Sequence, residues 1–179
     1  LSVKNLVFRG APGTGKTYTV QNAVKQKMLL ENAKSFFTQF HPSFGYEDFI
    51  EGLKPAIKNG ATELVLTDGI FKKFCKDAME ELKMAREEKR EPINYYFLAD
   101  EINRAELSSV FGELLLCIEE SKRVDFDENG NILDGSMLIG TQYSYLYQNE
   151  NDAVIVHNGE YKFGVPSNLY FLGTMNGID

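Results

Sequence analysis

The stretch Gly10-Ala-Pro-Gly-Thr-Gly-Lys-Thr17 decides the fold, because it has the G-x-x-x-x-G-K-T pattern of a phosphate-binding loop. An apolar run at 3–9 precedes it and predicts a buried strand, while residues 16–30 lack proline and glycine and predict a helix. A strand, a glycine loop and a helix in this order are the context in which the motif binds phosphate. A glycine-rich turn that binds no ligand is the alternative, and the flanking elements argue against it.

Each residue type in this loop has a chemical role. The glycines allow backbone conformations and a close approach that a Cβ would block. The N–H groups of the loop and of the helix N-terminus point at phosphate oxygens. The Lys16 ammonium reaches the β and γ phosphates, and the Thr17 hydroxyl binds Mg²⁺. The residues predicted to bind nucleotide here are Gly10, Ala11, Pro12, Gly13, Thr14, Gly15, Lys16, Thr17 and Tyr18.

The composition indicates one soluble globular domain. The chain has 179 residues, of which 43% are hydrophobic and 25% charged, and it is long enough to bury a core. It has no apolar run of bilayer length and no signal-peptide pattern, so we expect a cytoplasmic protein without a membrane contact. The net charge of −7 argues against this domain as the main DNA-binding part, because binding to the DNA backbone requires a basic surface.

Strands and helices alternate along the chain. Further strands are predicted at 35–40, 93–99 and 168–174, and helices at 46–58, 70–90 and 106–119. This alternation predicts a parallel sheet with helices on both faces, the three-layer α/β/α fold of a P-loop NTPase. Residues 1–179 then form one nucleotide-binding core.

Two insertions interrupt this core. A short strand at 62–67 and the turn Asp68-Gly69 mark a small insertion at about 59–68. The polar, turn-rich segment 123–165 is a larger one, in which 153–156 and 161–163 form a β-hairpin.

The strand predicted at 93–99 ends in two acidic residues, Asp100 and Glu101. An apolar strand that runs into two acids, downstream of a phosphate-binding loop, is a Walker B signature. Asp100 would hold Mg²⁺ through its water shell together with Thr17, and Glu101 would orient and deprotonate the attacking water. Two solvated acids at a strand end, without catalytic function, are the alternative.

The strand predicted at 168–174 is followed closely by Asn176. Its amide is placed to hydrogen-bond the γ phosphate or the attacking water, although asparagine is also common in turns. Since ligands of such sheets bind at the carboxyl ends of the strands, the predicted catalytic residues are Glu101, Lys16 and Asn176, with Asp100 and Asn176 also contacting the nucleotide.

Together these motifs resemble the AAA+ nucleoside triphosphatases, and the catalytic glutamate argues for attack by water rather than for a small-molecule kinase. Over nearly the whole chain, the sequence resembles the McrB family, the GTP-dependent motor subunits of modification-specific restriction systems of the 5-methylcytosine type. The blocks that carry this resemblance are Phe40-His-Pro-Ser-Phe-Gly-Tyr-Glu-Asp-Phe-Ile-Glu-Gly52, Asp68-Gly-Ile-Phe-Lys-Lys-Phe74, Asp100-Glu-Ile-Asn-Arg-Ala105 and Gly173-Thr-Met-Asn176.

The resemblance implies residue roles and partners. Lys16 and Thr17 take the Walker A role, Asp100 and Glu101 the Walker B role, and Asn176 the role of sensor one, with Mg²⁺ as cofactor and GTP or ATP as substrate. It also implies a ring of identical subunits, usually a hexamer, a McrC-like endonuclease partner, and DNA translocation by the full complex.

The chain departs from the family pattern in its last motif and in its extent. Where the family has Met-Asn-Thr-Ala-Asp, this chain has Met175-Asn-Gly-Ile-Asp179, so the choice between GTP and ATP stays open. The helical lid, sensor two and the arginine finger of the family lie beyond Asp179. We therefore expect a truncated AAA+ large subdomain that binds nucleotide weakly and hydrolyses it slowly.

Several alternatives stay open. The chain also resembles MoxR-type ATPases that remodel proteins, and a nucleotide-gated oligomerisation module without useful turnover is a third class. Arg104 either reaches a neighbouring subunit's nucleotide or caps the local acids. Tyr143, Tyr145 and Tyr147 share one face if their segment is a strand, either to stack on DNA bases or to pack the insertion onto its own domain.

Overall fold

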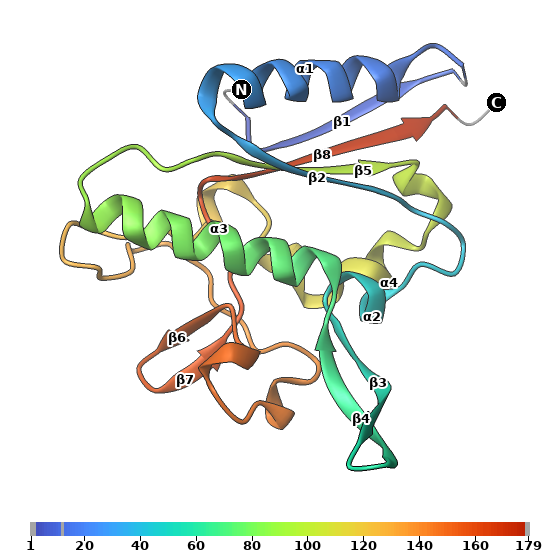
Figure 1. Ribbon diagram of the computed structural model, residues 1–179. Helices are drawn as coiled ribbons and strands as arrows, with labels where there is room; N and C mark the ends of the chain where they lie inside the picture. Colours follow the sequence, from blue (N-terminus) through green and yellow to red (C-terminus); the bar gives the residue numbers. More distant parts are fainter. Residues whose placement is uncertain (1–2, 12, 178–179) are drawn as a thin grey trace.

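The computed structural model describes residues 3–11 and 13–177, apart from the side chains of Lys16 and Lys58. A four-stranded parallel sheet in the order β1-β8-β5-β2 forms its centre (Figure 1). These strands are β1 (Asn5–Gly10), β2 (Lys34–Gln39), β5 (Tyr95–Asp100) and β8 (Leu169–Asn176). The parallel sheet predicted from the alternation of strands and helices is confirmed.

Helices cover the two faces of this sheet and complete three layers (Figure 1). On one face, α1 (Lys16–Glu31) packs Val20 and Val24 against Leu98 of β5 and Leu172 of β8. On the other face lie α2 (Tyr46–Phe49), α3 (Ile70–Glu87) and α4 (Leu107–Phe111). The core there is largely aromatic, as in the perpendicular contact of Phe71 with Phe97, whose ring centres lie 5.0 Å apart.

The helix predicted at 46–58 is wrong beyond Phe49. The chain instead forms an antiparallel hairpin of β3 (Glu51–Lys58) and β4 (Ala61–Asp68), and this hairpin contains the segment 59–68 that was predicted as the small insertion. Its turn is Asn59-Gly60, with φ of 50° and 80°. Two consecutive residues with positive φ are what a type I′ hairpin turn requires, and Asn-Gly is its preferred sequence. This dipeptide was the signal that the helix prediction overlooked.

The remaining predicted elements are partly confirmed. The helix at 70–90 is present as α3, whereas the one at 106–119 is short, because α4 passes at Gly112 into a 3₁₀ turn over 112–116. A side chain at position 112 would also meet the ring of Tyr46 at 3.1 Å. The predicted second hairpin is present as β6 (Ile155–His157) and β7 (Glu160–Lys162). The segment of the three tyrosines is a 3₁₀ turn over 144–146, not a strand.

Two arginines, Arg123 and Arg86, fix the start of the larger insertion to the core. The Arg123 guanidinium is buried and donates to the carbonyl oxygens of Ile118 and Leu169 and to Asn5 Oδ1, at 2.8, 3.1 and 2.6 Å. Its burial lowers the pKa of Arg123 to about 10. Arg86 of α3 binds both carboxylate oxygens of Asp125 at 2.9 Å.

No helix in the described part of the chain is long and apolar enough to cross a bilayer.

Candidate nucleotide-binding site

The phosphate-binding loop lies between the end of β1 and the start of α1. Gly13 and Gly15 have φ of 75° and 74°, in the left-handed region that side chains disfavour, and Gly15 directly precedes the first residue of α1. Thr14 Oγ1 donates to the Ala11 carbonyl oxygen at 2.8 Å within the loop. The glycines therefore stand where the sequence predicted that a backbone turn would need them. Pro12 and the Lys16 side chain lie outside the described part of the structure.

The end of β5 meets this loop through Asp100. Thr17 Oγ1 donates to Asp100 Oδ1 at 2.7 Å, which joins the first turn of α1 to the end of β5. Thr174 of β8 donates to the same carboxylate oxygen. Thr174 was not among the predicted site residues, although a hydroxyl in an otherwise apolar strand, two residues before Asn176, was a signal for it. The parallel pairing of β5 with β8 brings the two residues together, because Ala99 lies opposite Gly173.

Glu101 leaves β5 in a left-handed conformation, with φ of 52°. Its side chain is 17% exposed and lies between two donors. Asn176 Nδ2 donates to Glu101 Oε1 at 3.0 Å, and Arg104 forms an ion pair with Oε2. The backbone N–H of Glu101 also donates to Thr174 Oγ1 at 3.3 Å. Of the two alternatives for Arg104, the structure shows the contact with the local acid.

The loop and the ends of β5 and β8 line one cavity of about 380 Å³, a volume within the usual range of small-molecule sites. It is open to solvent beside Tyr18, whose side chain is 70% exposed. The lining residues from the predicted set are Gly13, Thr14, Gly15, Thr17, Tyr18, Asp100, Glu101 and Asn176. Residues from three separate parts of the sequence thus converge on one cavity.

The donor set of the cavity fits Mg²⁺. Thr17 and Asp100 offer a hydroxyl and a carboxylate oxygen that already touch each other, and hard oxygen ligands of this kind suit Mg²⁺. Among residues 3–11 and 13–177 there is no group of three or more His, Cys, Asp or Glu side chains that could hold a metal alone. Mg²⁺ in nucleotide sites takes one or two protein ligands and completes its shell with water and phosphate, which agrees with this sparse set.

The last motif of the chain also contacts the loop. The Gly177 N–H donates to the Gly10 carbonyl oxygen at 2.9 Å, one residue past the paired strands. Gly177, one of the two departures from the McrB pattern, therefore lies beside the phosphate-binding loop. The other departure, Ile178, and the matching Asp179 lie outside the described residues.

The chain matches the family AAA domain (dynein-related subfamily) over residues 5–179. The Type IV methyl-directed restriction enzyme EcoKMcrB subunit of Escherichia coli is 37% identical over 98% of this chain and 31% of that protein. The component YdiS of the Type II restriction enzyme BsuMI of Bacillus subtilis is 25% identical over 98% of this chain and 51% of its own. This chain thus spans about a third of one relative and about half of the other.

A solved crystal structure from Cytophaga hutchinsonii aligns with 98% of this chain and 35% of its own, at 18% identity and a TM-score of 0.43, which is too distant to support an assignment. The family match and the identity to McrB confirm the resemblance and the α/β P-loop NTPase fold that the motifs predicted. The chain therefore belongs to the AAA domain family, dynein-related subfamily.

Proposed function

We propose that this chain binds GTP or ATP with Mg²⁺ in the cavity at the strand ends and hydrolyses the γ phosphate. The observation that carries the proposal is a pair of hydrogen bonds. The hydrogen bond from Thr17 to Asp100 joins the phosphate-binding loop to the proposed Walker B strand. The hydrogen bond from Asn176 to Glu101 joins that strand to the proposed sensor one. Three motifs that are far apart in the sequence thus form one polar site.

The residues of the cavity have separable roles in this proposal. The N–H groups at the start of α1 bind the phosphates, and Lys16 adds a positive charge. Thr17 and Asp100 would hold Mg²⁺, which would offset negative charge on the phosphate oxygens.

Glu101 acts as the general base. Each of its carboxylate oxygens has a second lone pair, so it accepts a proton from the attacking water while Asn176 and Arg104 hold its position.

We further propose that hydrolysis powers DNA translocation in a McrBC-like restriction complex. Both curated relatives are named as parts of restriction enzymes, and the identity to the McrB subunit extends over 98% of this chain. The complex would contain a ring of this chain, with six copies in the McrB-like case, and a McrC-like endonuclease. The net charge of −7 supports a division in which other parts of the complex hold most of the DNA backbone.

A single-turnover hydrolysis assay with labelled GTP and ATP tests the enzymatic part of the proposal. Glu101→Gln keeps the size of the side chain but removes the base, so we expect hydrolysis to slow by roughly 10²- to 10⁴-fold while nucleotide binding persists. Glu119→Gln is the matched control, because Glu119 is exposed and does not line the cavity. Its hydrolysis rate should equal that of the unchanged chain.

Two results would contradict the proposal. Equal hydrolysis by Glu101→Gln and the unchanged chain would remove Glu101 from the mechanism. Tight nucleotide binding without any hydrolysis by the unchanged chain would instead favour a nucleotide-gated module.

A further inference from the structure

A second and larger cavity, of about 520 Å³, lies away from the nucleotide site, between the β3–β4 hairpin and the segment 146–152 of the larger insertion. One wall consists of the consecutive residues 63–66 of β4 together with Leu53, and the other includes Leu146, Asn149 and Asp152. Side chains of consecutive residues point to opposite faces of a strand. A cavity that touches all four residues of 63–66 therefore runs along the edge of β4.

The hairpin has one open edge and one blocked edge. Pro55 of β3 has no N–H, so Pro55 and Leu64 form a non-hydrogen-bonded pair of the antiparallel ladder. In such a pair the backbone N–H and C=O groups of both residues point away from the partner strand. Because such pairs alternate with hydrogen-bonded ones, Leu66 of β4 also points its N–H outward. The edge of β3 lacks a donor at Pro55. The edge of β4 keeps its donors, and in the described part of the chain β4 pairs with β3 alone.

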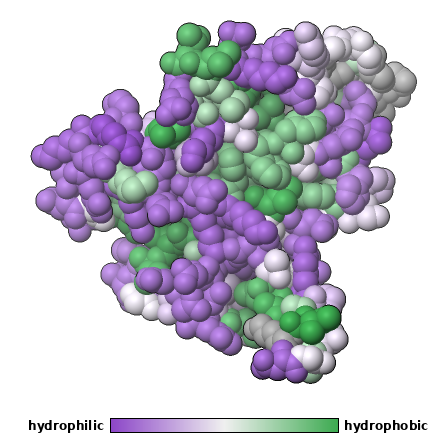
Figure 2. All heavy atoms as spheres, viewed as in Figure 1, coloured by the Kyte–Doolittle hydropathy of each residue, from purple (hydrophilic) through white to green (hydrophobic). Residues whose placement is uncertain are grey.

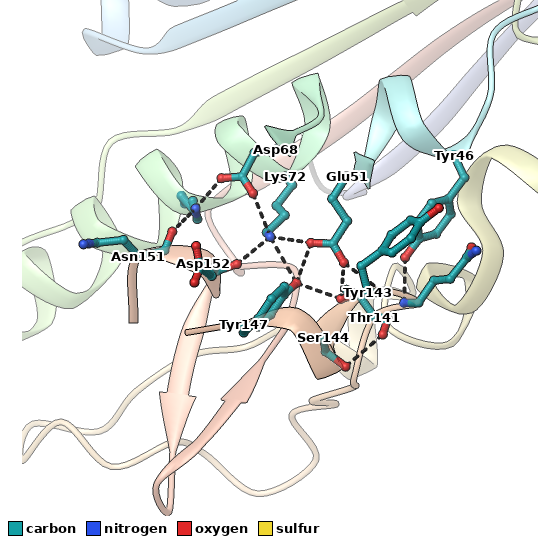
Figure 3. A network of polar contacts seen from close by, with 12 residues as sticks. Tyr46, Glu51, Asp68, Lys72, Thr141, Tyr143, Ser144, Tyr147, Asn151 and Asp152 are labelled. Atoms are coloured by element: carbon teal, nitrogen blue, oxygen red, sulfur yellow. Dashed lines mark hydrogen bonds and ion pairs between the residues drawn. The ribbon is translucent and has the colours of Figure 1, made fainter. Parts of the chain in front are cut away.

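A buried ionic cluster holds the two walls of this cavity in place (Figure 3). Lys72 of α3 is fully buried and donates to the equally buried Glu51, at the start of β3, at 2.5 Å. It also pairs with Asp68, at the end of β4, at 2.7 Å. From the other wall, Tyr147 Oη lies 3.0 Å from Lys72 Nζ, and the Asp152 carbonyl oxygen accepts a bond from it. One ammonium group thus fixes both strands of the hairpin to the insertion and holds the edge of β4 in a fixed position beside the cavity.

The residues that line the cavity indicate which kind of ligand fits it. Leu64 is 67% exposed, and apolar side chains also gather at the hairpin at the lower right of Figure 2. The charged residues that line the cavity are Glu63 and Asp152, both acidic, and no described basic side chain lines it. An acidic wall beside an open strand edge favours an extended polypeptide with apolar and basic side chains, and it disfavours nucleic acid.

We propose that the edge of β4 is a docking site for an extended, basic segment of a partner protein, which adds to the hairpin as a third strand. The partner's backbone pairs with the outward N–H and C=O groups of Leu64 and Leu66. Its alternate apolar side chains enter the cavity, and a lysine or arginine lies near Glu63. The proposal does not depend on nucleotide hydrolysis, since none of these residues lines the nucleotide cavity.

Selection from a phage-displayed library of random linear peptides, on the whole immobilised chain, tests this proposal. We expect the selected peptides to alternate apolar with polar residues and to carry lysine or arginine. Leu64→Pro removes an outward donor without removing a hairpin hydrogen bond, and it should weaken their binding by about tenfold or more. The matched control is Ile57→Pro, which makes the same change at an outward position of the β3 edge and should leave binding unchanged.

Two further measurements identify the contact. Hydrogen exchange should slow at the Leu64 and Leu66 amides when a selected peptide is bound, and Glu63→Gln should reduce the preference for basic peptides. Failure to select any peptide, or equal binding of the selected peptides to Leu64→Pro and the unchanged chain, would overturn the proposal. A dimer in solution that Leu64→Pro dissolves would overturn it too, by making a second copy the occupant.

Discussion

Glu101 combines a carboxylate held by Asn176 and Arg104 with a strained backbone conformation. A glutamate with φ of 52° is in a region that non-glycine residues rarely adopt, which costs on the order of 1 kcal/mol or more. The bonds from Asn176 and Arg104 to its carboxylate, and its own N–H bond to Thr174, stabilise this conformation. Backbone strain at a residue that lines a cavity is typical of functional sites.

Loss of the amide at position 176 should affect turnover more than binding. In Asn176→Ala the Glu101 carboxylate loses one charge-assisted hydrogen bond, so we expect single-turnover hydrolysis to slow by about tenfold to a hundredfold. Asn22→Ala on α1, outside the cavity, is the control. An unchanged hydrolysis rate in Asn176→Ala would show that this amide does not position the base.

At the residue scale, the sequence predicts those site residues that belong to continuous motifs. The phosphate loop, Asp100 and Glu101 each follow directly from a strand, so their positions could be predicted from local pattern. Thr174 could not, because its contact with Asp100 depends on how β8 and β5 align. The choice between the two roles of Arg104 likewise required the structure.

At the scale of elements, α3 carries a buried lysine that links both insertions to the core. Desolvation of an ammonium group is expensive and is offset here by Glu51, Asp68 and the Asp152 carbonyl oxygen. The sequence does not predict this cluster. Its partners are spread from residue 51 to residue 152, and the apolar pattern of α3 gives no indication that a lysine is buried.

Removal of this lysine should destabilise the fold strongly. Lys72→Met leaves Glu51 buried without its cation, so we expect the free energy of unfolding to fall by roughly 3–5 kcal/mol in urea denaturation. Lys73→Met, the same change at the next, exposed position of α3, should shift it by about 0.5 kcal/mol or less. Comparable small shifts in both variants would mean that the cluster contributes little.

The tie between α3 and the larger insertion should depend on pH. Burial raises the pKa of the Asp125 carboxyl, but hydrogen bonds from Arg86, Ser167 and the Phe126 N–H outweigh this and bring it below its ordinary value of 3.8. A carboxyl with a lowered folded-state pKa stabilises the fold above its unfolded pKa, and that contribution is lost as pH falls through the folded pKa.

We therefore expect Asp125→Asn to destabilise the protein at neutral pH by roughly 1–3 kcal/mol and to have a smaller effect below about pH 3. Chemical denaturation across this pH range checks the expectation. Asp134→Asn, at an exposed position, is the control. A destabilisation of equal size at every pH would exclude the ionic contribution.

The β3–β4 hairpin shows where element prediction failed. Phe49, Ile50 and Leu53 have helical spacing, and this local pattern favoured a helix that continued past Phe49. The Asn59-Gly60 turn and the pairing of β3 with β4 prevailed over it. The strands of the central sheet were predicted to within about two residues. For the buried inner strands β5 and β8 the reason is their nearly continuous apolar sequence.

At the scale of the whole molecule, the parallel strands bring their carboxyl ends, and the motif residues that follow them, to the same edge of the sheet. The nucleotide cavity lies at that edge, and the second cavity lies where the two insertions meet on the side of α3. The two cavities share no lining residue. One part of the molecule can thus carry the proposed hydrolysis while another takes part in assembly.

The most direct measurement of the central claim is titration calorimetry of the chain with Mg-GTP and with Mg-ATP. We expect one nucleotide to bind per chain. Lys16→Ala should abolish this binding, and Lys25→Ala, at an exposed position of α1, should leave it intact. The nucleotide that binds more tightly then answers the question that Gly177 leaves open. Binding that persists unchanged in Lys16→Ala, or no binding of either nucleotide, would contradict the claim that these strand ends form a nucleotide site.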